Sequence, residues 1–196
     1  MLSLEESLKI LKETNALIEG HFILSSGLHS SKYVQCAQLL SKPTQAEIIC
    51  SSLIEKITFN YKNINMILTP AIGGIVVGYE IGRQMKVQTI FAERNGYNLT
   101  LRRGFSISEN SNILIVEDVI TTGKSALECF EIVKSNKANL VGYACIIDRS
   151  DNKLLIKDKI VSQIKLKMAT FDKDNLPNDL KNIEPIKPGS RKKFDE

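Results

Sequence analysis

The sequence predicts an α/β protein in which a core of parallel β-sheet is flanked by helices. Short apolar segments rich in Ile, Leu and Val alternate along the chain with longer segments of helical periodicity. Such alternation is typical of strands joined by right-handed crossovers, with helices on both faces of the sheet. The chain has 196 residues and no internal repeat or Pro/Gly/Ser-rich linker, so we expect a single domain over residues 1–196.

The chain opens with an amphipathic helix expected over residues 4–18, with Ser3 as its N-cap and Glu6 completing a capping box. A second helix is expected over residues 44–57, where apolar side chains share one face. The elements expected after it are strands at 64–69, 87–92, 112–116, 140–147 and 164–171, with helices at 75–85 and 125–135.

Residues 93–111, ERNGYNLTLRRGFSISENS, interrupt the alternation. Their Asn-Gly pair and the following polar segment are typical of a β-hairpin rather than of a crossover helix. An insertion of this length between two strands predicts a mobile flap that projects from the sheet.

The formal charge of +4 and a pI near 8.8 raise the question of a nucleic-acid partner. Residues 151–196 hold 11 basic and 8 acidic side chains, so they carry three of the four surplus charges. The densest basic cluster, Arg191 to Lys193, lies in residues 188–196, which we expect to be a flexible, solvated tail. We therefore expect no nucleic-acid partner.

No segment approaches the roughly 18 consecutive apolar residues of a membrane helix, and Glu5 and Glu6 stand where a signal peptide needs basic residues. We expect a cytoplasmic protein with no membrane partner. The cysteines form no C-x-x-C pair, which favours small buried apolar side chains over disulfide partners or zinc ligands. They are Cys36, Cys50, Cys129 and Cys145.

The strongest chemical signal is the segment 113–125, ILIVEDVITTGKS. An apolar strand ends in Glu117 and Asp118, and a Thr-Thr-Gly loop then leads into a helix. Ligands bind outside the carboxyl ends of parallel strands, and a helix N-terminus with free N–H groups and hydroxyls suits phosphate. Carboxylates beside it can hold ribose hydroxyls, or Mg²⁺ through water. The segment therefore predicts a sugar-phosphate site.

This segment has two other interpretations. Gly123 to Ser125 resembles the end of a P-loop, but Asp118 stands where that motif needs glycine. The two carboxylates could also serve only as helix caps. A cap needs one carboxylate or hydroxyl, whereas two acids, two threonines and a serine converge here.

The segment 113–125 resembles the motif by which type I phosphoribosyltransferases bind 5-phosphoribosyl 1-diphosphate (PRPP). Four other segments resemble the orotate phosphoribosyltransferases of that family: 20–30 (GHFILSSGLHS), 70–75 (PAIGGI), 91–94 (FAER) and 101–105 (LRRGF). The resemblance implies the type I phosphoribosyltransferase fold, with the hairpin as its flap and a small N-terminal hood element within residues 1–40.

The implied reaction is displacement of diphosphate from C1 of PRPP by N1 of orotate, which gives orotidine 5′-monophosphate in pyrimidine (UMP) synthesis. The family implies Mg²⁺ as cofactor and a homodimer. Two alternatives stay open: transfer to another base, and a non-catalytic, PRPP-sensing regulator that binds nucleic acid. The segment 20–30 favours orotate, and residues 1–150 carry no basic stripe that would favour the regulator.

The resemblance also implies residue roles. Glu117 and Asp118 should hold the ribose hydroxyls and, with Arg94, are the expected catalytic residues; Mg²⁺ should be held through PRPP and water near Asp118, without a direct protein ligand. The expected PRPP contacts are Glu117, Asp118, Val119, Ile120, Thr121, Thr122, Gly123, Lys124 and Ser125, with Ala71, Gly73 and Gly74 at the diphosphate. The expected orotate contacts are Thr121, Arg149, Ser26 and Tyr33. His21 and His29 are open to a direct role or a hydrogen-bonding one.

The flap departs from the family pattern, because residues 93–105 contain no lysine where many members have several. Ser25 also stands where some members have lysine, and Lys124 could compensate for it. The expected flap cations are Arg94, Arg102 and Arg103, acting within the subunit or across a dimer.

Overall fold

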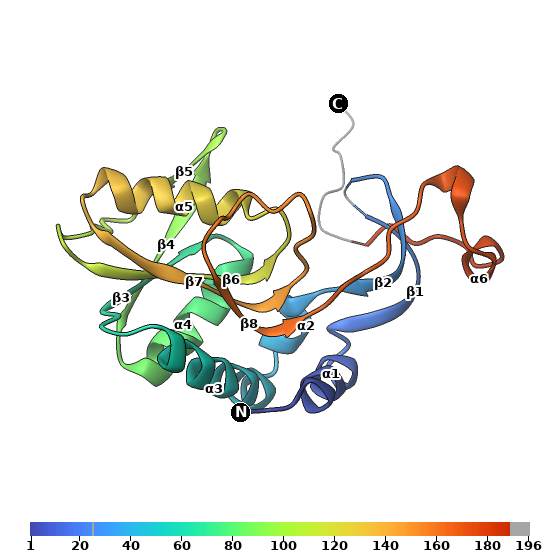
Figure 1. Cartoon of the computed structure of the whole chain (residues 1–196), viewed down its shortest axis with the longest axis horizontal. Coiled ribbons are helices and arrows are strands. Elements are labelled where there is room, and N and C mark those ends of the chain that lie inside the picture. Colours follow the sequence, from blue (N-terminus) through green and yellow to red (C-terminus); the bar gives the residue numbers. More distant parts are fainter. Residues whose placement is uncertain (25, 189–196) are drawn as a thin grey trace.

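The computed structural model describes residues 1–24 and 26–188. The strands of its main sheet are β3 (Met66–Pro70), β4 (Gln88–Asn95), β5 (Asn98–Leu101), β6 (Asn112–Ile120), β7 (Asn139–Asp148) and β8 (Ile160–Lys165). Their spatial order is β5-β4-β3-β6-β7-β8, and all neighbours are parallel except β4 and β5. Helices α3 (Pro43–Asn60) and α4 (Gly73–Met85) cover one face, and α5 (Lys124–Ser135) covers the other (Figure 1). The predicted α/β architecture is confirmed.

Each face of the sheet has its own apolar core. On one face, Leu53 of α3 and Val77 of α4 are fully buried. On the other face, Cys129 and Val133 of α5 are fully buried. All four cysteines are free and buried, as the sequence predicted. Burial of this apolar surface is the main force that holds the helices on the sheet.

The opening helix α1 (Leu4–Glu13) has the predicted capping box between Ser3 and Glu6. It ends before residue 18 because Asn15 takes a left-handed φ of 57°, a conformation that asparagine tolerates. The following residues then pair as a strand instead of continuing the helix.

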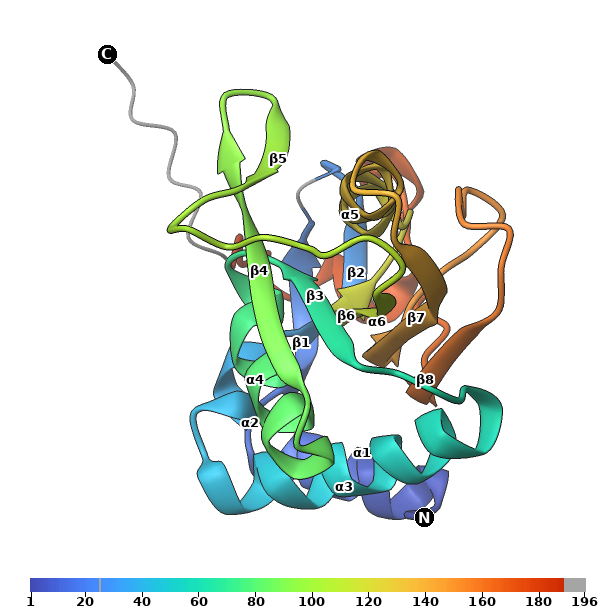
Figure 2. The ribbon, with the colours of Figure 1, turned by 90° about the vertical axis from the view of Figure 1, so that its left-hand side faces the viewer.

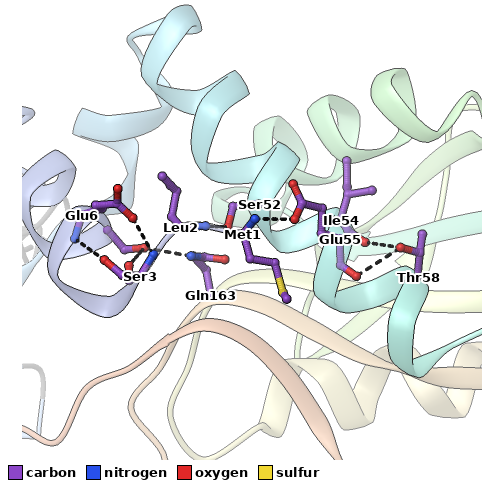
Figure 3. A network of polar contacts seen from close by, with 10 residues as sticks. Met1, Leu2, Ser3, Glu6, Ser52, Ile54, Glu55, Thr58 and Gln163 are labelled. Atoms are coloured by element: carbon purple, nitrogen blue, oxygen red, sulfur yellow. Dashed lines mark hydrogen bonds and ion pairs between the residues drawn. The ribbon is translucent and has the colours of Figure 1, made fainter.

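Polar contacts join the start of the chain to the main body (Figure 3). The backbone N–H of Leu2 donates to Oγ of Ser52 on α3 at 2.7 Å. From β8, Nε2 of Gln163 donates to Oγ of Ser7 at 2.8 Å. These contacts fix α1 against α3 and β8, and the strand after α1 starts from this anchored point.

A two-stranded antiparallel hairpin, which we call the hood, stands apart from the main sheet (Figure 1). It consists of β1 (Leu17–Ile23) and β2 (His29–Val34). The remaining short helices are α2 (Cys36–Leu40), the 3₁₀ helix η1 (Lys173–Asn175) and α6 (Asn178–Lys181).

The last strand differs from the sequence expectation of 164–171. In β8, Lys165 pairs with Asp148, the last residue of β7, so no neighbouring strand exists beyond that point. The chain therefore crosses to the hood, where Phe171 forms a bridge with His29.

The segment after Phe171 also lies on the hood rather than running free as a polar tail. Ile186 forms a bridge with Phe22, and the backbone of His21 accepts a hydrogen bond from the N–H of Ile186 at 2.8 Å. Residues 189–196, most of the tail expected to be flexible, lie outside the described residues, as does Ser25.

The predicted hairpin is present as β4 and β5, with its turn at Gly96 and Tyr97, and it projects beyond the other strands (Figure 2). Strand β6 is longer than the predicted 112–116, because its pairing with β7 continues to Ile120. Glu117 and Asp118 therefore lie within the strand rather than after it. No helix in the described part of the chain is long and apolar enough to cross a membrane.

Candidate active site

The two adjacent carboxylates of β6 form the centre of the site. Glu117 and Asp118 are both half-buried on the strand. Burial, followed by the negative charge of Asp118, raises the pKa of Glu117 to about 8, against the effect of the Ala126 backbone N–H. Burial also raises the pKa of Asp118, against hydrogen bonds from the Val119 N–H and its own. Two crowded acids of this kind favour a ligand that brings hydroxyl donors or a cation.

The phosphate loop, residues 121–125, joins β6 to α5. Gly123 has a φ of 75° and stands at the N-cap of α5, and a Cβ there would lie 2.7 Å from Ile156. Thr121, Thr122 and Lys124 are exposed. Gly123 has no side chain to cap the helix, so N–H groups in the first turn of α5 other than that of Ala126, which acts on Glu117, can bind an anion.

The loop after β3, residues 71–74, lies directly beside the acidic pair. A Cβ atom at Gly73 would lie 2.8 Å from a carboxylate oxygen of Asp118, and one at Gly74 would lie 1.9 Å from Oγ1 of Thr69. A Cβ at either position would have to displace the side chain of Asp118 or Thr69, so the two glycines let the N-terminus of α4 come close to Asp118. The Ala71–Ile72 peptide bond in this loop is cis. The structure thus brings together the predicted diphosphate loop and the acidic pair.

Arg149 follows β7 at the same edge of the sheet. Its backbone N–H donates to the carbonyl of Ile120 at 2.8 Å, and its Nε is buried with no hydrogen-bond partner among the described residues. Burial lowers the pKa of Arg149, and the nearby Tyr33 and Cys36 oppose that shift. A half-buried guanidinium without a partner suits a planar anionic ligand.

The other predicted orotate contacts are placed differently. Tyr33 of β2 lies close enough to act on the Arg149 guanidinium and stacks near Phe22, with 5.6 Å between ring centroids. Ser26 lies in the exposed loop between β1 and β2, where its Oγ accepts a weak bond from the Leu28 N–H at 3.4 Å. The structure therefore groups Tyr33 with Arg149, and gives Ser26 no described contact with either.

His21 and His29 have hydrogen-bonding positions inside the hood. Nε2 of His21 and Nδ1 of His29 lie 2.6 Å apart, and Nδ1 of His21 lies 2.7 Å from the carbonyl oxygen of Ile183. Because a carbonyl can only accept, Nδ1 of His21 is the donor, and His29 must donate to Nε2 of His21 when both rings are neutral. The pair joins the hood to the C-terminal segment.

The three predicted flap cations have different surroundings. Arg103 forms a fork with the carboxylate of Glu93, with both N–O distances 2.8 Å. Arg94 donates to Glu128 on α5 at 2.5 Å and to the carbonyl of Tyr97 at 2.7 Å. Arg102 is exposed and has no ion pair within the described residues.

Sequence reasoning missed Glu93, Glu128 and Ile156. Glu128 could have been noticed because it lies four residues after Lys124 on the same helix, one turn from the phosphate loop. Ile156 packs where Gly123 lacks a side chain, and the N–H of Leu155 donates to the Thr122 carbonyl at 2.9 Å. These contacts come from a distant loop, and local sequence carries no signal for them.

Comparison with known proteins adds independent evidence. Residues 37–176 match the family described as phosphoribosyl transferase domain. The orotate phosphoribosyltransferase of Caldicellulosiruptor bescii is 45% identical over 95% of this chain and 97% of its own length. That of Methylorubrum populi is also 45% identical, over 95% of this chain and 96% of its own.

A solved structure extends the likeness to the fold. The orotate phosphoribosyltransferase of Aeropyrum pernix superimposes with a TM-score of 0.70 at 21% identity, over 81% of this chain and 92% of that chain. The predicted type I phosphoribosyltransferase fold is confirmed. From the near full-length matches, we conclude that this chain belongs to the phosphoribosyltransferase family, and within it to the orotate phosphoribosyltransferases.

Proposed function

We propose that the chain transfers the 5-phosphoribosyl group of PRPP to N1 of orotate, giving orotidine 5′-monophosphate and diphosphate in pyrimidine nucleotide synthesis. The observation that carries this proposal is the close approach of the loop at residues 71–74 to Asp118, which lies three residues before the phosphate loop. The phosphate loop follows β6. In the other loop, a Cβ atom added to Gly73 would lie only 2.8 Å from a carboxylate oxygen of Asp118. A substrate with a phosphate at each end and hydroxyls between them matches this arrangement.

In this proposal, PRPP lies across the acidic pair. The backbone N–H groups of residues 121–125 and the cation of Lys124 hold the 5′-phosphate, and residues 71–74 hold the diphosphate. Glu117 and Asp118 accept hydrogen bonds from the ribose hydroxyls. The bond from C1 to the diphosphate oxygen breaks ahead of the new bond from C1 to N1, so positive charge develops on the ribose, and the proton on N1 of orotate passes to water. The two carboxylates stabilise that charge electrostatically.

Arg149 is the proposed partner of the orotate carboxylate. Its buried Nε, which has no hydrogen-bond partner among the described residues, and its place at the carboxyl end of β7 support this role. A guanidinium can bind a carboxylate with two parallel hydrogen bonds, which orients the ring as well as attracting it. Tyr33 is the neighbouring group on the hood side.

Mg²⁺ is the proposed cofactor. The oxygen donors at the site are the carboxylates of Glu117 and Asp118, whose pKa values burial has raised, and hard oxygen ligands suit Mg²⁺. The ion would neutralise charge on the diphosphate. Asp118 is the residue that would hold it through water, while Gly73 leaves room beside that carboxylate.

Dimerisation is proposed from the exposed face of α4. Ile72, Val76 and Tyr79 are 85%, 49% and 65% exposed, and they follow one another at helical spacing beside the diphosphate loop. An apolar stripe of this kind supports a second copy of the chain as its cover. A cytoplasmic location agrees with the four free thiols.

The test is product formation from PRPP and Mg²⁺ with orotate, adenine or hypoxanthine as acceptor. We expect release of diphosphate with orotate only, and loss of that release when Mg²⁺ is chelated. Turnover of a purine base with orotate inert would contradict the substrate assignment. Salt-sensitive binding of RNA or DNA without any turnover would instead favour the regulator.

A further inference from the structure

A polar contact joins the flap hairpin to the helix that follows the phosphate loop. One guanidinium nitrogen of Arg94, near the end of β4, donates to Oε2 of Glu128 on α5 at 2.5 Å. The same carboxylate oxygen accepts the backbone N–H of Leu99 in β5 at 3.2 Å. The Arg94 guanidinium also donates to the carbonyl of Tyr97 in the hairpin turn at 2.7 Å. Both strands and the turn of the hairpin are thus tied to one carboxylate on α5.

Arg94 and Glu128 each lie on an element that adjoins one of the two proposed phosphate-binding loops. On one side, the N–H of Ala71 in the diphosphate loop donates to the carbonyl of Ala92 at 2.8 Å, two residues before Arg94. On the other side, α5 begins at Lys124 within the phosphate loop, one helical turn before Glu128. The contact therefore joins β4, which lies beside the diphosphate loop, to α5, which continues the 5′-phosphate loop.

The carboxylate side of this contact is more buried than the guanidinium side. The side chain of Glu128 is 20% exposed and that of Arg94 is 44% exposed. Oε1 of Glu128 is buried and has no hydrogen-bond partner among the described residues. Removal of Arg94 would leave a largely buried carboxylate with little compensation, which favours a rearrangement of the hairpin on α5.

We propose that Arg94 and Glu128 form a positioning pair that fixes the distance between the diphosphate loop and the 5′-phosphate loop, so that one PRPP molecule can contact both. This inference rests on the proposed function. In it, Arg94 acts through Glu128 and does not contact the diphosphate. The same pair also affects the acidic centre, because the charge of Glu128 is among the influences that raise the pKa of Glu117.

The proposal separates ligands with two phosphate-bearing ends from ligands with one. Calorimetric titration in Mg²⁺ buffer would measure the affinities of PRPP, inorganic diphosphate and ribose 5-phosphate for the wild type, Glu128→Gln, Arg94→Gln and the double variant. We expect each single substitution to lower the affinity for PRPP about tenfold, because small misplacements of binding groups are costly. The other two ligands, which use one loop each, should change less than about twofold. The double variant should bind PRPP no more weakly than Arg94→Gln does, because the two residues act as one unit.

The matched control is Glu109→Gln. Glu109 pairs with Lys137 at 2.9 Å, just beyond the other end of α5, and both side chains are more than half exposed. This variant should leave all three affinities unchanged. Thermal melts establish that each variant is folded; if Glu128→Gln fails to fold, Glu128→Asp retains the charge but shortens the side chain, and it should weaken PRPP selectively.

Two outcomes would overturn the positioning pair. One is that Arg94→Gln weakens diphosphate as much as PRPP while Glu128→Gln weakens neither, because Arg94 would then be a direct diphosphate ligand. The other is unchanged PRPP affinity in both single variants. Failure of the proposed function is distinguishable, since wild-type protein that binds PRPP but does not consume orotate would leave these affinity comparisons intact.

Discussion

The loops beside Asp118 and the hairpin beyond β4 both carry groups expected to bind phosphate, yet they are built differently. In the loops, Gly73 and Gly123 allow close approaches that a Cβ would prevent, and backbone N–H groups are the proposed phosphate donors. In the hairpin, two of the three arginines are already engaged by Glu93 and Glu128 of the same chain. In the proposed complex the loops can receive phosphate as they stand, whereas Arg94 and Arg103 must either exchange partners or serve as structural ties.

The largest effect on activity should come from a substitution of Asp118 in β6. Asp118→Asn should lower kcat/KM for PRPP about 10²- to 10³-fold, because the charge that stabilises the developing ribose cation is lost. Stability should be unchanged or increased, since burial already disfavours the charged form of Asp118. Steady-state kinetics and a thermal melt measure both. A loss of stability in step with activity would point to a structural role instead.

Arg149→Lys should come next, with an increase in KM for orotate of about 100-fold and little change in PRPP affinity. A lysine retains the charge but cannot reproduce the planar fork to a carboxylate. Kinetics with orotate as the varied substrate, together with PRPP titration, check this. An equal weakening of orotate and PRPP binding would contradict the assignment of Arg149 to the orotate pocket.

The pKa of Glu117 predicts a pH dependence of stability in the unliganded protein. Burial raises that pKa from 4.5 to about 8, so the folded state retains a proton that the unfolded state has released. Stability should therefore fall between about pH 5 and pH 8, by up to about 5 kcal/mol, and level off above that range. Denaturant melts across this range should show a flatter profile for Glu117→Gln. An identical profile in wild type and variant would contradict the assignment.

Gly123→Ala and Gly96→Ala compare the two regions directly. Both glycines have positive φ, 75° and 59°, but a Cβ at Gly123 meets Ile156 at 2.7 Å while one at Gly96 meets nothing within 4 Å. Gly96→Ala should cost about 1 kcal/mol of stability from backbone strain alone. Gly123→Ala should cost about 1–2 kcal/mol and also weaken PRPP binding. Equal PRPP affinity in the two variants would weaken the case for a preorganised phosphate loop.

The smallest effect is expected for Arg102→Ala. Arg102 is the flap arginine that is exposed without an ion pair in the described part of the chain, so it is free to approach the diphosphate. Its loss should lower kcat/KM for PRPP up to about tenfold without moving the melting temperature. The same kinetics with Arg103→Ala tell whether the Glu93-bound arginine contributes as well; a larger effect there would reverse the assignment.

The sequence was most informative where a local pattern determines structure. The apolar strand, the two acids and the Thr-Thr-Gly loop predicted both the β6 to α5 connection and its place at the sheet edge, and Ser3 and Glu6 predicted the helix start. Strand ends were less predictable, because β6 extends through Asp118 only where β7 provides a partner. Pairings such as Arg94 with Glu128 join residues 34 positions apart, and no local pattern shows which of several nearby charges an arginine will meet.

In the proposed complex, one PRPP molecule is held by both loops across the acidic pair. A crystal structure with PRPP and Mg²⁺ bound tests it most directly. We expect the 5′-phosphate on the backbone of residues 121–125, the diphosphate on residues 71–74, and the ribose hydroxyls on Glu117 and Asp118. A ligand bound with its two ends reversed, or away from β6, would contradict it.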